Sequence, residues 1–251
     1  MSLVVRDLAV RYGQRQALAG VSFEARPGEV TAIIGPNGSG KSSLIRAIAG
    51  LVDHQGSIRC GAEGAERIGY MPQDVGSRAA LTVLEVVLLG RLRALHLRLT
   101  DADLDAAGRA LATLGIEHLA ARDLAELSGG QRQLVFLAQV LASEPQILLL
   151  DEPISALDIR HQVEVLDTVH RLTRERGLAT LVVLHDLAAA ARFADRIIVL
   201  KEGHIACDGQ PPKVLTPELV FEVFGLAAVV TTVQGAGLAI LPCLARPVGC
   251  D

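Results

Sequence analysis

Eight residues decide the fold: Gly35-Pro36-Asn37-Gly38-Ser39-Gly40-Lys41-Ser42. They fit the pattern G-x-x-x-x-G-K-[ST] of a phosphate-binding loop. The stretch before them, Val30–Ile34, is β-branched and almost wholly apolar, which predicts a buried parallel strand. The stretch after them predicts a helix over Lys41–Ala49 that Gly50 ends. The loop is therefore expected between a strand and a helix, the context in which this motif binds phosphate.

The residue types of this loop suit a phosphate. Glycines let the backbone approach an anion closely, and exposed N–H groups at the start of a helix attract phosphate oxygens. Lys41 adds a positive charge for β- and γ-phosphates, and the Ser42 hydroxyl is suited to Mg²⁺. A glycine-rich turn that fits the pattern by chance is the alternative, and the flanking strand and helix argue against it. We expect nucleotide contacts along the whole motif and at the next residue, Ser43.

A second glycine-rich helix start lies at Ser128-Gly129-Gly130-Gln131. Ser128 and Gln131 have the spacing of a capping box. Capping alone does not account for two glycines in the first turn, because each costs about 1 kcal/mol relative to Ala in a helix interior. Missing side chains at the positive end of a helix indicate that an anion comes very close. Because the first loop already binds one anion, we infer that this second contact is supplied to another subunit.

Two acidic residues follow the apolar strand predicted at Ile147–Leu150. Ligand sites in open α/β sheets lie beyond the carboxyl ends of the strands. There, Asp151 is suited to hold Mg²⁺, and Glu152 to deprotonate an attacking water, a role that contributes about 10²–10⁴-fold in rate. A solvated acidic turn is the alternative, and it fits the nearby phosphate loop less well. His185 follows the strand predicted at Thr180–Leu184, and its place at the same edge favours a γ-phosphate contact.

Composition limits the class of protein. The 251 residues suit one large domain, or one domain with a sizeable insertion, and 50% of them are hydrophobic, enough for a substantial core. The net charge is −4 and no basic stripe interleaves with aromatics, so nucleic acid is not expected as a partner. The N-terminus does not have the layout of a signal peptide. The cysteines form no C-x-x-C pair and are interpreted as reduced thiols: Cys60, Cys207, Cys243 and Cys250.

The stretch Gly225–Ala245 contains no charged residue and is long enough to span a bilayer. It also contains polar residues, glycines and Pro242, and it divides into Ala227–Val233 and Leu238–Leu244. This division predicts a β-hairpin, with a transmembrane helix as the alternative. Because the chain is unusually apolar, a membrane-bound partner is also an expectation.

The rest of the chain alternates strands and helices, which indicates an α/β fold with a mostly parallel sheet. Residues 2–25 are expected to form two or three antiparallel strands, and residues 74–127 an inserted helical region. Further strands are expected at Ile68–Met71 and Arg196–Leu200. Helices are expected at Leu81–Leu92, Asp101–Leu114 (with Thr100 as N-cap), Arg132–Ala142, Ile159–Arg176 and Leu187–Phe193.

With these motifs in this order, residues 1–225 resemble the nucleotide-binding subunit of an ATP-binding cassette (ABC) transporter. The resemblance rests on Walker A, the Leu-Ser-Gly-Gly-Gln signature, Walker B, the D-loop and the switch histidine, which occur in sequence. It implies a P-loop NTPase with a RecA-like core, an antiparallel β subdomain and an inserted α-helical subdomain at about 74–127. Residues 226–251 would add the hairpin and a tail, with no regulatory domain.

The resemblance also assigns roles. By spacing alone Tyr12 would be ordinary packing and Gln73 a loop residue, but the family implies that Tyr12 stacks on adenine and that Gln73 joins Mg²⁺ to the helical subdomain. Asp158, by itself a plain N-cap, matches the aspartate at the dimer seam. The implied catalytic residues are Glu152, His185, Lys41 and Gln73. The implied Mg²⁺ ligands are Ser42, Gln73 and Asp151. The residues implied to contact ATP bound by the opposite protomer are Ser128, Gly129, Gly130 and Gln131.

The partners implied are a second copy of the chain, packed head to tail around two ATP molecules, and polytopic permease subunits. An extracytoplasmic substrate-binding protein would act indirectly, and the chain would lie on the cytoplasmic face of the bacterial inner membrane. The stretches Leu81–Arg91 and Asp158–Leu166 look like those of importers for iron–siderophore, haem and cobalamin. Zinc and manganese importers share the first stretch but match the second less well. The rivals are a soluble ABC protein acting on ribosomes or DNA, and a nucleotide-binding module without turnover.

Overall fold

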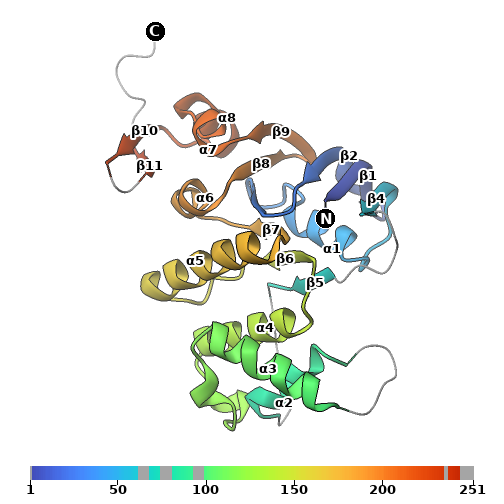
Figure 1. Ribbon diagram of the computed structural model, residues 1–251. Helices are drawn as coiled ribbons and strands as arrows, with labels where there is room; N and C mark the ends of the chain where they lie inside the picture. The colour runs from blue at the N-terminus through green and yellow to red at the C-terminus, as the bar shows by residue number, and fades with distance from the viewer. Residues whose placement is uncertain (1, 62–67, 74–80, 93–98, 235–236, 244–251) are drawn as a thin grey trace.

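The structure is a computed structural model that describes residues 2–61, 68–73, 81–92, 99–234 and 237–243 (Figure 1). A central sheet has the strand order β5-β6-β7-β3-β8-β9. Its first five strands are parallel, and β9 is antiparallel to β8. The mostly parallel sheet predicted from the sequence is therefore present. The strand bounds are β3 (Glu29–Ile34), β5 (Ile68–Met71), β6 (Ile147–Asp151), β7 (Ala179–Val183), β8 (Arg196–Lys201) and β9 (His204–Gly209).

A second, antiparallel sheet packs against the first, with the order β2-β1-β4. Strands β1 (Leu3–Tyr12) and β2 (Arg15–Ala25) are the two expected in residues 2–25, and β4 (Gln55–Cys60) comes later in the chain. Alternate residues of the central strands point to opposite faces. Ile33 and Leu149 pack with this second sheet and with helix α1 (Lys41–Ile48), whereas Ala32 and Leu148 pack with the helices on the other face.

Helices α2, α3 and α4 form a separate layer beside the sheet (Figure 1). Their bounds are Val83–Leu89, Asp101–Thr113 and Gly129–Ala142, with short 3₁₀ turns at Glu117–Leu119 and Leu124–Glu126. The expectation of a helix over Leu81–Leu92 is too long, because a capping box from Thr82 to Glu85 starts α2 at Val83 and Gly90 is its C-cap. Thr100 caps α3 as predicted. Helix α4 begins three residues earlier than predicted, because the Ser128–Gln131 capping box fixes its start.

Ion pairs join these three helices into one unit. Arg91, just after α2, contacts Asp103 of α3 at 2.9 Å and Glu144, just after α4, at 3.1 Å. Arg109 of α3 contacts Glu144 at 3.3 Å. The hydrogen bond from the Thr100 N–H, then the Arg91 guanidinium and the Thr100 hydroxyl, hold the pKa of Asp103 at about 2.

The remaining helices and a C-terminal hairpin complete the fold. Helix α5 (Ile159–Arg176) and helix α6 (Leu187–Phe193) have the predicted bounds, and the short helices α7 (Pro211–Val214) and α8 (Pro217–Phe224) come before the C-terminal hairpin. Strands β10 (Ala228–Val233) and β11 (Gly237–Pro242) pair in antiparallel register, so this segment is a hairpin rather than a spanning helix. Within the described part of the chain, no helix has the length and apolar character needed to cross a membrane.

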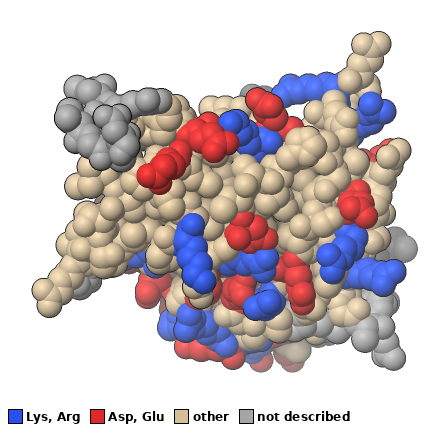
Figure 2. All heavy atoms as spheres, turned by 90° about the horizontal axis from the view of Figure 1, so that it is seen from above, with Lys and Arg blue, Asp and Glu red and all other residues tan. Residues whose placement is uncertain are grey.

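Charged side chains of both signs are interspersed on the face seen in Figure 2, with wide uncharged areas between them. This mixed distribution agrees with the small net charge of −4. The face seen there does not concentrate positive charge in one place.

Candidate functional site

A hollow of about 630 Å³ opens at the carboxyl ends of the central strands. Parallel strands of an α/β sheet place their ligand sites at this edge. The hollow brings together segments that are far apart in the chain: the phosphate loop after β3, and residues after β5, β6 and β7. The residues that line it are Tyr12, Arg15, Ala17, Asn37, Gly38, Gly40, Lys41, Ser42, Ser43, Gln73, Glu152 and His185.

The phosphate loop has a shape that only glycine permits at two positions. Gly40, the N-cap of α1, has a φ angle of 106°, and a Cβ built there would lie 2.6 Å from the carbonyl oxygen of Ala17. A Cβ on Gly35 would lie 2.1 Å from the carbonyl oxygen of Leu200. The loop is therefore pressed against β2 and β8 of its own chain, which fixes the start of α1 at the hollow.

The Lys41 ammonium is enclosed by the same loop. Its Nζ atom donates to the carbonyl oxygens of Gly35 at 2.8 Å and Pro36 at 3.0 Å, and only 6% of the residue is exposed. Burial lowers the pKa of Lys41, and the nearby Glu152 and Asp151 carboxylates oppose this shift. A cation thus lies within the loop that the sequence assigns to phosphate.

Asp151 and Ser42 offer oxygen ligands beside this loop. The Ser42 hydroxyl donates to Asp151 Oδ1 at 3.2 Å, and Asp151 is fully buried at the end of β6. Burial is the main cause that raises the pKa of Asp151. Among the described residues, the buried side-chain polar atoms that lack a hydrogen-bond partner are Asp151 Oδ2 and Ser39 Oγ. An orphaned carboxylate oxygen next to a hydroxyl fits the oxygen ligands that Mg²⁺ prefers.

The Glu152 carboxylate links the ends of three strands. Gln73 Nε2, after β5, donates to Glu152 Oε2 at 2.8 Å. His185 Nε2, after β7, is hydrogen-bonded to Glu152 Oε1. Glu152 itself has a φ angle of 54°, a left-handed conformation that is unusual for a residue with a side chain. The structure therefore places three of the predicted site residues in direct contact at the mouth of the hollow.

The hollow does not include the predicted residues of the second glycine-rich segment. Ser128 and Gly129 are exposed at the start of α4, and the Ser128 hydroxyl accepts from the Gln131 N–H at 3.2 Å while Gln131 Oε1 accepts from the Ser128 N–H at 3.1 Å. Asp158 is exposed as well, and it caps α5 by accepting from the His161 N–H at 3.0 Å. These groups line no part of their own chain's hollow.

The two glycines of this segment have different surroundings. A Cβ on Gly130 would lie 2.9 Å from Leu157 Cδ2 and 3.4 Å from the carbonyl oxygen of Ala156, so a side chain there would have to displace the end of Leu157. The nearest atom to a Cβ on Gly129 would be Ala156 Cβ at 3.8 Å. Packing within the chain therefore accounts in part for the glycine at position 130, whereas Gly129 is free of such close contacts.

Arg15 and Ala17 line the hollow but were missed in the sequence. Both lie at the start of β2, and Arg15 is paired with Tyr12, which is 46% exposed at the end of β1. A Cβ on Gly38 would lie 3.4 Å from Arg15 Nη2, so the guanidinium lies against the phosphate loop. A basic residue three positions after the aromatic is the only local signal, and it is a weak one.

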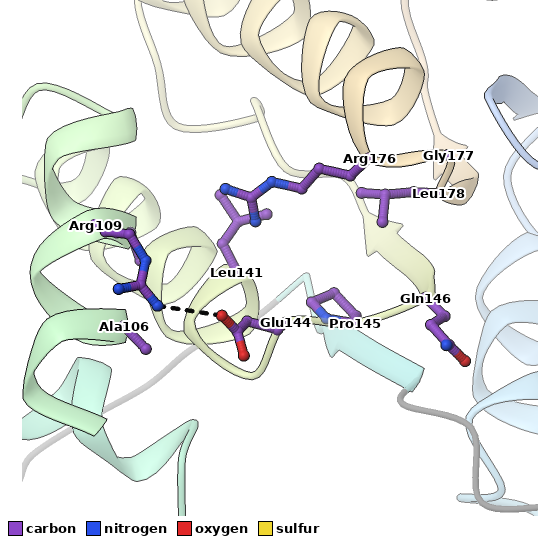
Figure 3. A pocket seen from close by; sticks show the side chains of 10 residues that line it. Ala106, Arg109, Leu141, Glu144, Pro145, Gln146, Arg176, Gly177 and Leu178 are labelled. Atoms are coloured by element: carbon purple, nitrogen blue, oxygen red, sulfur yellow. Dashed lines mark hydrogen bonds and ion pairs between the residues drawn. The ribbon is translucent and has the colours of Figure 1, made fainter. Parts of the chain in front are cut away.

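A second hollow, of about 410 Å³, lies at the opposite ends of the strands (Figure 3). Arg109 of α3 contacts Glu144 on one side of it, and Arg176 extends toward it from the end of α5. Gln146 and Leu178, which precede β6 and β7, also line it. It contains none of the residues predicted for the site, and it separates the layer of α3 and α4 from the end of α5.

Residues 18–155 match the family model described as ABC transporter. The chain belongs to the ABC transporter family. It is 39% identical over 251 aligned residues to the hemin import ATP-binding protein HmuV of Plesiomonas shigelloides, covering 89% of this chain and 95% of the relative. It is 37% identical to the ferric enterobactin transport ATP-binding protein FepC of Escherichia coli K12, covering 96% and 93%.

Solved structures of ABC transporters have the same fold. A metal-chelate type ABC transporter in an inward-facing conformation gives a TM-score of 0.85 at 30% identity, covering 96% of both chains. The ADP conformation of an ATP-binding cassette gives 0.77 at 28% identity, covering 88% of this chain and 97% of that one. The expected family and the expected P-loop NTPase fold are confirmed. This ABC protein is an ATPase that binds ATP.

Proposed function

We propose that this ABC ATPase powers an importer for an iron–siderophore, haem or a related metal chelate. Its relatives support the cargo class, since they are named for hemin import and for ferric enterobactin transport. The observation that carries the turnover proposal is the Glu152 carboxylate, held by Gln73 and His185 beside the phosphate loop. A module that only bound nucleotide would have no need of this arrangement.

The proposed ATP contacts are made mainly by residues that line the hollow. Tyr12 stacks on the adenine, and the phosphate loop from Gly35 to Ser43 surrounds the phosphates through its N–H groups and the Lys41 ammonium. Ser42 and Asp151 would hold Mg²⁺, with Gln73 close by, because they supply oxygen atoms at the same edge. When bound, Mg²⁺ would neutralise charge on the phosphate oxygens.

For hydrolysis, we assign the proton transfer to Glu152. A water attacks the γ-phosphorus, the bond to the β-γ bridging oxygen breaks, and the Glu152 carboxylate accepts a proton from the water. His185, already hydrogen-bonded to Glu152, would contact the γ-phosphate. The products are ADP and inorganic phosphate.

A second copy of the chain would complete each site. Ser128 and Gly129 are exposed at the positive end of α4, Gln131 is half-buried, and all three lie outside their own chain's hollow. We propose that they, with Gly130, grip ATP bound by the partner protomer, and that Asp158 lies at the seam. In this scheme residues 1–225 form the cassette, with the helical subdomain at about 74–127, and residues 226–251 form the hairpin and tail.

The cassette would work at the cytoplasmic face of the bacterial inner membrane with polytopic permease subunits. An extracytoplasmic binding protein would deliver the cargo to them. Closing of the ATPase dimer on ATP would change the access of the permease. The cargo itself would never touch this chain.

Co-expression tests this proposal. The tagged chain, expressed with the permease genes that neighbour its own, should co-purify with a polytopic membrane protein. In proteoliposomes the complex should take up haem or a ferric siderophore in an ATP-dependent manner. Uptake of zinc or manganese alone would overturn the cargo class, and association with ribosomes instead of a membrane protein would favour the soluble rival.

A further inference from the structure

Residues 152–158 connect β6 to α5, and glutamine side chains from the helices on either side hold this loop. Gln133 of α4 uses both ends of its amide: Nε2 donates to the carbonyl oxygen of Glu152 at 2.9 Å, and Oε1 accepts from the Ala156 N–H at 3.1 Å. Only 5% of Gln133 is exposed. A buried amide with both functions satisfied fixes the backbone that it contacts.

Gln162 of α5 holds the same loop at other positions. Its Nε2 donates to the carbonyl oxygens of Leu157 at 3.0 Å and Ile154 at 3.3 Å. Among the described residues, the donors to the Glu152 carbonyl oxygen are Gln133 Nε2, Ser155 Oγ and the Ser155 N–H, so Gln162 does not bond to it. The two glutamines are thus a matched pair, and only Gln133 contacts the residue that bears the proposed base.

The backbone of Glu152 needs such support. Its φ of 54° is sparsely populated for residues with a Cβ, and it persists only where the surroundings hold it. The direction of the carboxylate depends on this angle. Because the carbonyl that Gln133 contacts belongs to the same residue, a shift of the amide changes where the carboxylate points.

Helix α4 therefore connects two functional groups of the chain. Gln133 lies about one turn after Gly129, the exposed residue at the start of the helix. Arg91 and Arg109 tie the other end of α4, at Glu144, to helices α2 and α3, next to the second hollow (Figure 3). A displacement of the layer that these three helices form would carry the Gln133 amide with it.

We propose that Gln133 is a positioning residue that makes the orientation of Glu152 depend on the placement of α4. When α4 contacts the nucleotide of the partner protomer, the Gln133 amide orients the Glu152 carboxylate in its own chain's site. This inference rests on the proposed role of Glu152 as the base. It assigns Gln133 no contact with ATP.

The test is a double-mutant cycle between Gln133 and Glu152 in the purified full chain, measured by release of labelled phosphate. Gln133→Met keeps the approximate size and removes both amide functions, and Gln133→Glu keeps the acceptor for Ala156 but loses the donor to Glu152. Both should lower kcat by about 10-fold or more, because small misplacements of a reacting group have effects of this size. KM for ATP should change less than about 3-fold, since no ATP contact is lost.

The decisive readout is the same change in a Glu152→Gln background. If Gln133 acts through Glu152, Gln133→Met should then lower the residual rate by less than about 2-fold, because residues that act as a unit are not additive. Gln162→Met, the matched control, should lower kcat much less than Gln133→Met. Melting temperature and ATP affinity are measured for every variant, and Gln133→Glu alone completes the cycle if Gln133→Met does not fold.

Each outcome decides between the claims. Full additivity in the cycle, or an unchanged kcat in both Gln133 variants, would overturn the positioning role. Equal losses for Gln133→Met and Gln162→Met would show general support of the loop and would also overturn it. If Glu152→Gln alone hydrolyses ATP at the parent rate, the base assignment of the proposed function fails, which is a separate result.

Discussion

The chain has two glycine-rich helix starts, and they differ in how much of their surroundings the chain itself supplies. The phosphate loop before α1 is enclosed: Gly35 and Gly40 press against the backbone of β8 and β2, and the Lys41 ammonium is buried in the loop. The start of α4 is open, and Ser128 and Gln131 bond to each other while Gly129 is exposed and does not line the hollow.

This difference shows what one copy can complete. The enclosed start is shaped by contacts within the chain and already carries its cation, so ATP binding should need one copy only. The open start offers N–H groups at a positive helix end but has no ligand site of its own. Hydrolysis should therefore need two copies, and variants at the two helix starts should separate binding from turnover.

The largest effect is expected for Glu152→Gln. It removes the proposed base but neither helix start, so hydrolysis should fall by about 10²–10⁴-fold. ATP should stay bound, and an ATP-dependent dimer should accumulate in size-exclusion chromatography. Glu117→Gln, on an exposed 3₁₀ turn, serves as the control and should keep the parent rate. Hydrolysis at the parent rate by Glu152→Gln would remove it as the base.

A glutamate placed at each helix start tests the comparison itself. Asn37→Glu puts a negative charge into the phosphate loop and should weaken ATP binding to the monomer by about 10- to 100-fold. Gly129→Glu should leave monomer binding intact, because the residue lies outside the hollow and an acid is tolerated at a helix start. It should still lower hydrolysis by about 10- to 100-fold by repelling the partner's phosphates. Equilibrium binding and phosphate release measure the two effects.

Mixing these two variants provides the matching control. A dimer of one Asn37→Glu and one Gly129→Glu copy would contain one site with an intact loop and an intact facing helix start. The mixture should regain activity above the sum of the separate proteins. If Gly129→Glu weakens ATP binding to the monomer as much as Asn37→Glu does, the two starts do not differ as claimed.

A smaller effect is expected for Arg15→Ala. The guanidinium lies against the phosphate loop at the edge of the hollow, where solvent weakens its attraction for phosphates. KM for ATP should rise by about 2- to 5-fold while kcat stays unchanged. Steady-state kinetics measure both, with Arg59→Ala on the exposed side of β4 as the control. A fall in kcat with constant KM would assign Arg15 to catalysis instead.

The smallest effect concerns stability. Burial raises the pKa of Asp151 above its value in the unfolded chain. The contribution of Asp151 to folding stability is therefore fully present at low pH and is lost as the pH rises through the pKa of the folded protein. Asp151→Asn removes this cost at pH 7, and the melting temperature should rise on the order of 2 °C, as for a stabilisation below about 1 kcal/mol. The difference should vanish at about pH 3, where both states carry a protonated Asp151. A lower melting temperature at pH 7 would show that the carboxylate stabilises the fold.

Local sequence was sufficient for the elements that place the site. The phosphate loop, its strand and its helix follow from one motif, and α5 follows from the Asp158 N-cap and Gly177, which has a φ of 64° at its C-cap. The contacts between segments that are distant in the chain could not be predicted from local sequence. Gly130 meets Leu157, and Gln133 meets Glu152, only because α4 packs on the loop after β6. Arg15 lies against the phosphate loop, and the spacing from Tyr12 is too weak a signal to predict this contact.

The most direct test of the two-copy site is a crystal structure of Glu152→Gln with ATP and Mg²⁺. The account predicts a two-fold dimer in which the Gly129 N–H lies about 3 Å from a phosphate oxygen of the nucleotide held by the other copy. A closed, nucleotide-bound structure in which Gly129 faces solvent, remote from either triphosphate, would contradict it.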